Sequence, residues 1–202
     1  MKFLISAAVV ALATAALPAH ADVLYANAGP TGPVESPGSY NVFVVSGAGS
    51  GALLFTIDGY ATLDGVNFYE DDFTLTINGS DVLKLSYDLG GGGGNSIFTN
   101  TLGATVSDRY LSGNHWAINV EIAALPLLAG SNSFSFAYDS LVPGHAGPQG
   151  LGDEGWGLSN IRLTGPAAGA VPEPASWALM IGGLGLVGGA MRRRSKTAVR
   201  FA

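Results

Sequence analysis

The sequence predicts an all-β protein, an antiparallel β-sandwich or jelly roll, with an apolar helix expected near each end of the chain. Apolar and polar residues alternate with a period of two through most of the central region, which is the pattern of half-buried strands. Glycine accounts for 30 of 202 residues and charged residues for only 12%. This composition is typical of β-rich, turn-rich proteins rather than helical ones. The uncharged apolar stretches lie outside the alternating region, close to the two termini.

The first 21 residues have the three-part pattern of a secretory signal peptide. Lys2 gives a positive start, residues 3–17 form an uncharged apolar run, and Ala19 and Ala21 are small residues at the two positions that matter before a cut. We therefore expect a signal peptide helix in residues 1–21 and a mature chain that begins near Asp22, where the composition changes to that of a loop. A buried N-terminal helix is the alternative.

The central region, residues 22–164, is predicted to form one β-sandwich domain of seven to nine short strands. Its clearest hairpin covers residues 73–89, where apolar and polar residues alternate on both sides of Asn78-Gly79, the strongest short hairpin signal. The alternation predicts one buried face and one wet face. Further strands are predicted at residues 40–45, 53–57, 116–122, 134–138 and 158–163.

Glycine-containing pairs and runs mark the expected turns and loops. Asp58-Gly59 and Asp64-Gly65 are predicted to be turns. The five glycines at 90–94 are predicted to be a flexible loop rather than a phosphate cradle, because no Lys-Ser/Thr follows them. Residues 165–171 are small and featureless and are predicted to be a linker.

The C-terminal segment, residues 172–202, is predicted to contain a single transmembrane helix. Residues 175–191 form an uncharged apolar stretch of 17 residues, the lower limit for a membrane span. Trp177 stands at its outer edge, where an indole suits the interface, and Arg192, Arg193 and Arg194 follow at once, as at a cytoplasmic flank. The alternatives are a permanent C-terminal membrane anchor and an anchor that a peptidase later removes.

The order of features in this segment resembles the PEP-CTERM sorting signal of exported proteins. Pro172-Glu173-Pro174 is followed by Trp177, a glycine-rich apolar helix and the cluster Arg192, Arg193 and Arg194. By this resemblance those seven residues are the sorting motif, and the partner is exosortase, a membrane peptidase expected to cut near Pro-Glu-Pro. Residues 195–202 are a departure, since many such signals stop soon after the arginines.

The same resemblance implies a route and a location. The chain is expected to leave the cytosol of a Gram-negative bacterium through the secretory translocon and to meet signal peptidase. It is then expected to form an inner-membrane intermediate facing the periplasm, before release to the cell surface or the extracellular space.

A second, shorter resemblance covers residues 149–164, which are similar to the last strand of many PEP-CTERM proteins and of lectin-like jelly rolls. Asp153, Glu154 and Trp156 match that pattern, and Ser159 replaces the usual Asp. Asp153 and Glu154 are candidate Ca²⁺ ligands, because Ca²⁺ prefers carboxylate and carbonyl oxygens in loops. The alternative is that these acids pair with an arginine or face water. No other cofactor is expected.

Charge and motifs exclude several functions. Residues 22–173 hold all fifteen acids and three bases, a net charge of −12, which argues against nucleic-acid binding. The sequence has no cysteine and therefore no disulfide or thiolate metal site. A GxSxG elbow, an HExxH motif and a P-loop are absent, and nothing around His115 or His145 suggests a catalytic group.

The acidic run Glu70-Asp71-Asp72 has three interpretations. We expect it to be a solvent-facing loop that leads into a strand, because neighbouring like charges usually stay in water. A second cation site, or an acid pair for glycoside hydrolysis, is the alternative.

Three functions remain open for the body. The first is a non-enzymatic surface or matrix protein, which we favour. The second is a carbohydrate-binding module of an exopolysaccharide matrix, and the third is an enzyme that acts on polysaccharide. Five aromatic residues could stack on a sugar or belong to the core: Tyr60, Tyr69, Tyr110, Trp116 and Trp156.

Overall fold

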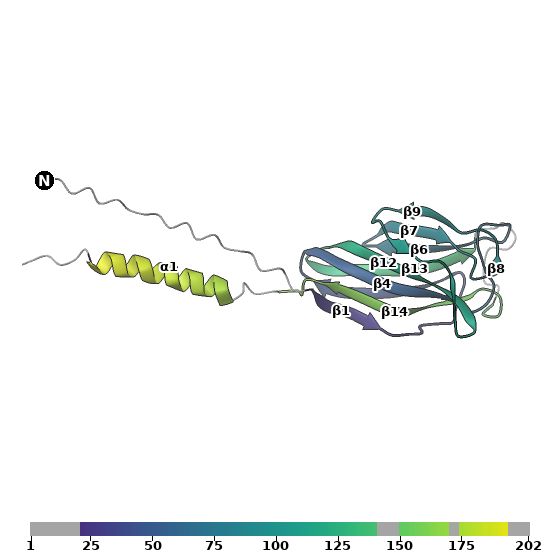
Figure 1. Cartoon of the computed structure of the whole chain (residues 1–202), viewed down its shortest axis with the longest axis horizontal. Coiled ribbons are helices and arrows are strands. Elements are labelled where there is room, and N and C mark those ends of the chain that lie inside the picture. The colour runs from purple at the N-terminus through teal and green to yellow at the C-terminus, as the bar shows by residue number, and fades with distance from the viewer. Residues whose placement is uncertain (1–20, 141–149, 170–173, 194–202) are drawn as a thin grey trace, which may run out of the picture.

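The computed structural model describes residues 21–140, 150–169 and 174–193. Within these ranges the chain forms a sandwich of two antiparallel sheets and one helix near the C-terminus (Figure 1). The prediction of an all-β antiparallel sandwich is confirmed. The predicted signal peptide, residues 1–21, lies almost wholly outside the described residues.

The larger sheet has the strand order β1-β14-β4-β12-β10, and two short strands join it at β14 and β12. Its strands are β1 (Asp22–Asn27), β2 (Val34–Glu35), β4 (Gly49–Gly59), β10 (Thr105–Val106), β11 (Tyr110–Ser112), β12 (His115–Leu127) and β14 (Gly155–Gly165).

The smaller sheet has the order β3-β13-β6-β7-β9. Its strands are β3 (Gly38–Ser46), β6 (Asp71–Ile77), β7 (Ser80–Ser86), β9 (Ser96–Asn100) and β13 (Gly130–Ser140). A separate parallel pair, β5 (Leu63–Asp64) and β8 (Gly90–Gly92), lies at one end of the sandwich, labelled by β8 in Figure 1.

The alternating pattern places apolar side chains between the sheets. Phe55 of the larger sheet is fully buried, and its ring lies 5.1 Å from Phe136 and 5.9 Å from Phe73 of the smaller sheet, measured between ring centroids. The predicted hairpin is confirmed as β6 and β7. Its turn residues Asn78 and Gly79 have φ of 50° and 81°, the positive values that a tight two-residue hairpin turn requires.

Four local predictions were wrong. Asp64-Gly65 is not a turn, because Asp64 belongs to β5 and the N–H of Gly65 donates to the Gly92 carbonyl at 2.8 Å. Asp58-Gly59 is not a turn: both residues continue β4, where Asp58 pairs with Ala117 of β12. The first glycines of the run at 90–94 form β8 instead of a free loop, because the backbone of β5 offers them a partner. The segment after Asp22 is a strand, β1, that pairs with the end of β14.

The end of the body is tied into the sandwich. Gly165 closes β14, and the next residue, Pro166, accepts a backbone hydrogen bond from Gly47 at 2.9 Å. The first residues of the predicted linker are thus held by the body.

The predicted C-terminal helix is present as α1 (Pro174–Arg193). Within the described part of the chain, no helix combines the length and the apolarity that crossing a membrane requires. The prediction that this helix is transmembrane is therefore not confirmed. Five of its residues are glycines, which add little apolar surface.

Candidate functional site

The predicted sorting motif falls on α1 and on the residues beside it. Pro174 is the first residue of the helix, a position that suits proline because the missing N–H would have no partner there. Trp177 lies in the first turns of α1, and Arg192 and Arg193 are its last two residues. Pro172, Glu173 and Arg194 lie outside the described residues.

A second set of polar residues gathers inside the sandwich, at the end where β5 and β8 lie. In β6 the inward-facing series Phe73, Leu75 and Ile77 continues backwards to Asp71, which is 0% exposed. In β14 the inward-facing series begins at Trp156, and Glu154, in the bend directly before this strand, is 4% exposed. Two carboxyl groups, one on β6 and one just before β14, therefore lie at the end of the core.

These two carboxyl groups are in direct contact. The side chains of Asp71 and Glu154 are hydrogen-bonded to each other. The Oδ2 atom of Asp71 also accepts a hydrogen bond from the backbone N–H of Asp64 at 2.9 Å. A carboxylate cannot donate, so an Asp–Glu hydrogen bond requires a proton on one of the two groups.

Burial is the main reason that this proton stays bound near neutral pH. It raises the pKa of Asp71 to about 7, an effect opposed by the hydrogen bond from Asp64 and reinforced by the nearby negative charge of Asp64. Burial likewise raises the pKa of Glu154 to about 8, reinforced by the charges of Asp71 and Asp153. The pair is held in a desolvated, acid-rich environment.

Three buried hydroxyl groups without partners lie on residues close to the pair. Within the described ranges, the hydroxyls of Ser36, Tyr138 and Ser140 are buried and have no hydrogen-bond partner. Ser140 is in register with Asp71 across the sheet, and the N–H of Ser36 donates to the Glu154 carbonyl at 3.0 Å. Burial and then the charge of Asp71 raise the pKa of the Tyr138 phenol, which places this hydroxyl near the acids. We call Ser36, Asp71, Tyr138, Ser140 and Glu154 the acid end cluster.

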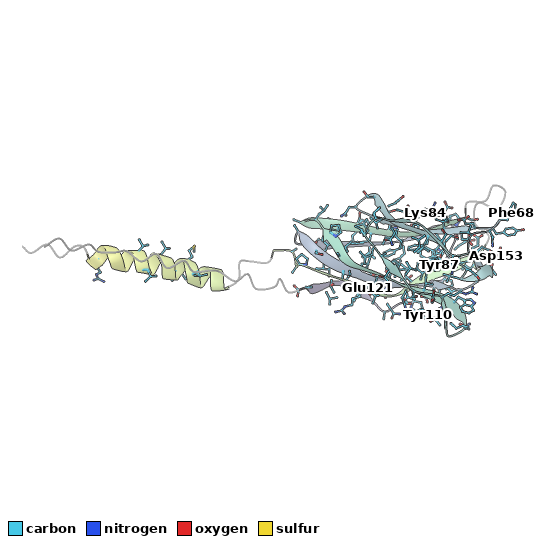
Figure 2. The ribbon with its side chains drawn as sticks, turned by 45° about the horizontal axis from the view of Figure 1, so that its top comes forward. Phe68, Lys84, Tyr87, Tyr110, Glu121 and Asp153 are labelled. Carbon is cyan, nitrogen blue, oxygen red and sulfur yellow. The ribbon has the colours of Figure 1, made fainter. Side chains whose placement is uncertain are left out.

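The structure separates the two predicted Ca²⁺ ligands. Glu154 points into the acid end cluster, whereas the neighbouring Asp153 is exposed and its Oδ1 accepts a hydrogen bond from the Thr62 hydroxyl at 2.7 Å. Figure 2 places Asp153 at this end of the body, together with Phe68. Over the part of the chain that is described, no three His, Cys, Asp or Glu residues are grouped so that they could hold a metal ion.

The prediction that the run Glu70-Asp71-Asp72 faces solvent was wrong for two of its residues. Asp71 is turned to the core and Asp72 is 3% exposed on the opposite face, where the Nζ atom of Lys84 lies 2.8 Å from its Oδ2. The alternation of β6 could have revealed this, since Asp71 has the same parity as Phe73. The contact between Asp71 and Glu154 is also closer than the about 5 Å or more that separates glycosidase carboxyl pairs.

The remaining histidine and aromatic candidates are dispersed. His115 has its Nε2 atom 2.9 Å from the buried Asp58 carboxylate, and its ring centroid lies 4.6 Å from that of Tyr60. His145 lies outside the described residues. Sequence reasoning missed the His115–Asp58 pair because the two residues are far apart in the chain and meet only across β4 and β12.

Neither tryptophan of the body has an exposed ring face on which a sugar could stack. Trp156 is fully buried, and its ring centroid is 5.4 Å from that of Tyr138. Trp116 is half-buried beneath the guanidinium of Arg109, which also pairs with Asp88. Tyr110 donates to the amide oxygen of Asn119 at 3.0 Å. Only Tyr69, with its neighbour Phe68, presents a largely exposed ring among the described candidates.

Comparison with known proteins identifies the tail. The model of the PEP-CTERM protein-sorting motif matches residues 170–194, which contain all seven predicted motif residues. The search of curated proteins found no match to the chain. The match supports an exported protein that an exosortase sorts to the surface of a Gram-negative cell. It covers the tail and none of the sandwich, so it carries no information on what the body binds.

Proposed function

We propose that the chain is a non-enzymatic protein of the cell surface or extracellular matrix, delivered by exosortase processing of its C-terminal tail. The observation that carries the proposal is the sorting motif at residues 170–194, placed directly after a complete sandwich domain. Processing there would remove α1 and leave the body intact, because the last strand ends at Gly165.

The proposed route has two steps before that cut. The translocon exports the chain and signal peptidase removes residues 1–21. The apolar tail then pauses in the inner membrane with its arginines on the cytosolic side. The uncharged run at 175–191 and the arginine cluster that follows it support this intermediate.

A non-enzymatic role fits the body. The buried acid pair Asp71–Glu154 is a direct side-chain contact inside the core, unlike the carboxyl pairs of glycosidases, which are about 5 Å or more apart. The His115–Asp58 pair has no described nucleophilic hydroxyl or thiol bonded to it. These contacts support a structural role for the acids.

Mass spectrometry of the mature C-terminus tests the proposal. We expect the protein recovered from a cell with active exosortase to end within or near residues 172–177. In a cell without exosortase we expect the tail to remain, and the protein to stay in the membrane fraction.

A matched pair of variants sharpens this test. Glu173→Gln changes the centre of Pro-Glu-Pro and should leave the tail uncut, whereas Glu121→Gln, an exposed acid on β12, should be processed as wild type. A wild-type protein that keeps residue 202 in the presence of exosortase contradicts the proposal.

Carbohydrate binding is the second candidate, and one observation favours it. Phe68 and Tyr69 are 66% and 49% exposed at the β8 end, with ring centroids 5.1 Å apart and edge-to-face. Exposed aromatic rings beside hydrogen-bonding groups such as Asn67 and Asp64 offer both stacking and polar contacts to a sugar. Loss of polysaccharide pull-down in Phe68→Ala, but not in Phe43→Ala, would support this candidate; equal retention by both would reject it.

A further inference from the structure

We propose that the acid end cluster binds one divalent cation of the Ca²⁺ type, held by the carboxyl groups of Asp71 and Glu154 between the two sheets. This inference concerns the body alone and does not depend on how the tail is sorted.

Charge is the first argument. Two carboxylates balance the charge of one divalent cation, and in the described chain no basic side chain neutralises Asp71. Two of the described bases are engaged with other acids: Lys84 pairs with Asp72, and Arg109 pairs with Asp88. A buried carboxylate without a counter-charge is costly unless a proton or a cation compensates it.

The supply of oxygen ligands is the second argument. Ca²⁺ takes six to eight oxygens, from carboxylates, carbonyls and hydroxyls, at distances of about 2.3–2.6 Å. The contact between Asp71 and Glu154 brings oxygens of both side chains within reach of one ion. Tyr138 and Ser140 are 1% and 2% exposed, and their hydroxyl oxygens have no described partner. A bound cation would satisfy these oxygens.

Two carboxylates are enough for such a site. No described group of three acids or histidines converges on one point, so the remaining ligands would be hydroxyl and backbone carbonyl oxygens. Ser36 adds a third buried hydroxyl, on a segment whose N–H is bonded to the Glu154 carbonyl. The predicted ligand pair Asp153–Glu154 is thereby replaced by Asp71–Glu154.

The site would join the two layers of the sandwich. Asp71, Tyr138 and Ser140 belong to β6 and β13 of the smaller sheet, whereas Glu154 directly precedes β14 of the larger one. Because the chain has no cysteine, a shared cation would provide a cross-link between the sheets that no disulfide can supply.

Calcium titration of the full chain tests the proposal. After EDTA treatment and buffer exchange, we expect CaCl₂ to bind with one-to-one stoichiometry in calorimetry and to raise the melting temperature. We also expect a change in tryptophan fluorescence, because the ring of Trp156 packs on Tyr138. NaCl of matched ionic strength should produce neither the heat nor the fluorescence change.

The variants separate the proposed ligands from the other acids. Asp71→Asn and Glu154→Gln keep shape and hydrogen bonding, and each should weaken Ca²⁺ binding at least tenfold. Asp153→Asn and Glu121→Gln should stay close to wild type. Figure 2 shows Glu121 on a different part of the body from Asp153.

Two results would overturn the proposal. One is the absence of saturable binding by wild type at the roughly 10⁻³ M Ca²⁺ that loads weak extracellular sites. The other is wild-type affinity in Asp71→Asn. If Asp71→Asn fails the circular-dichroism check of folding, Glu154→Gln and Ser140→Ala decide the question by the same titration.

Discussion

The middle of the sandwich and its β8 end are built by the same strands but have opposite chemistry. In the middle, the ring of Phe55 packs against the rings of Phe73 and Phe136. Two residues before Phe73 in β6 the inward position is Asp71, and it meets Glu154 from the bend before β14. The alternation of the strands sets which way a side chain points and leaves open what lies there.

The two regions differ in whether their buried groups need bonding partners. Packed rings exclude water and need no partner, whereas buried carboxyl and hydroxyl groups lose free energy unless each one is bonded. The end cluster therefore depends on protons or ions in solution, and the middle does not. Three measurements test this contrast.

The largest effect is expected in the middle. Phe55→Ala removes a fully buried ring that bridges the sheets, and it should lower the free energy of unfolding by about 3–5 kcal/mol. Urea unfolding measures the change. Phe43→Ala, at a ring that is 72% exposed on β3, is the control and should change stability by less than about 0.5 kcal/mol. Equal losses in the two variants would contradict the assignment of the core.

An intermediate effect is expected at the acid pair, as a dependence of stability on pH. In EDTA, the pKa of Asp71 is about 7 in the folded chain and near 3.8 when unfolded, so the folded state binds the proton more tightly. Stability should be greatest at acidic pH and should fall as pH rises from about 4 through about 7. The loss should be on the order of 2–3 kcal/mol between pH 5 and pH 8.

The Asp71→Asn variant checks that this loss comes from the pair. An amide does not titrate, so the decline of the unfolding free energy with pH should be shallower than in wild type. Glu121→Gln should keep the wild-type slope, since its side chain is exposed. A wild-type slope in Asp71→Asn would show that other groups control the pH dependence.

The smallest effect is expected on the outer face of β6. Lys84→Met removes the base that pairs with Asp72 but keeps the aliphatic stem, and it should cost about 1 kcal/mol because the lysine is one-third exposed and screened by water. Thermal unfolding at low and high salt measures it. A loss as large as that of Phe55→Ala would mean that the outer pair, too, behaves as part of the core.

The strands of the central region were predictable because side-chain periodicity depends on backbone geometry alone. The β6–β7 hairpin and its Asn78-Gly79 turn follow directly from local pattern and from the positive φ that these residues tolerate. The sorting motif was predictable for a similar reason, because it is defined by a contiguous segment of residues.

The acid end cluster was only partly predictable from the sequence. Alternation along β6 places Asp71 on the inner face, but its partner Glu154 is 83 positions away, in the bend before β14. The environment of Asp58 also depends on tertiary contacts. Strand β12 lies beside β4 and brings His115 to the Asp58 carboxylate. Local composition had instead favoured a turn at Asp58-Gly59.

The period-two strands, the hairpin turn, the acidic character of the body and the sorting motif follow from the amino-acid sequence alone, because each depends on residues close together in the chain. Which acids lie in water and which lie in the core depends on how the two sheets pack. Burial, charge balance and hydrogen bonding at Asp71, Glu154 and Asp58 are set by neighbours that only the packing of two sheets brings together.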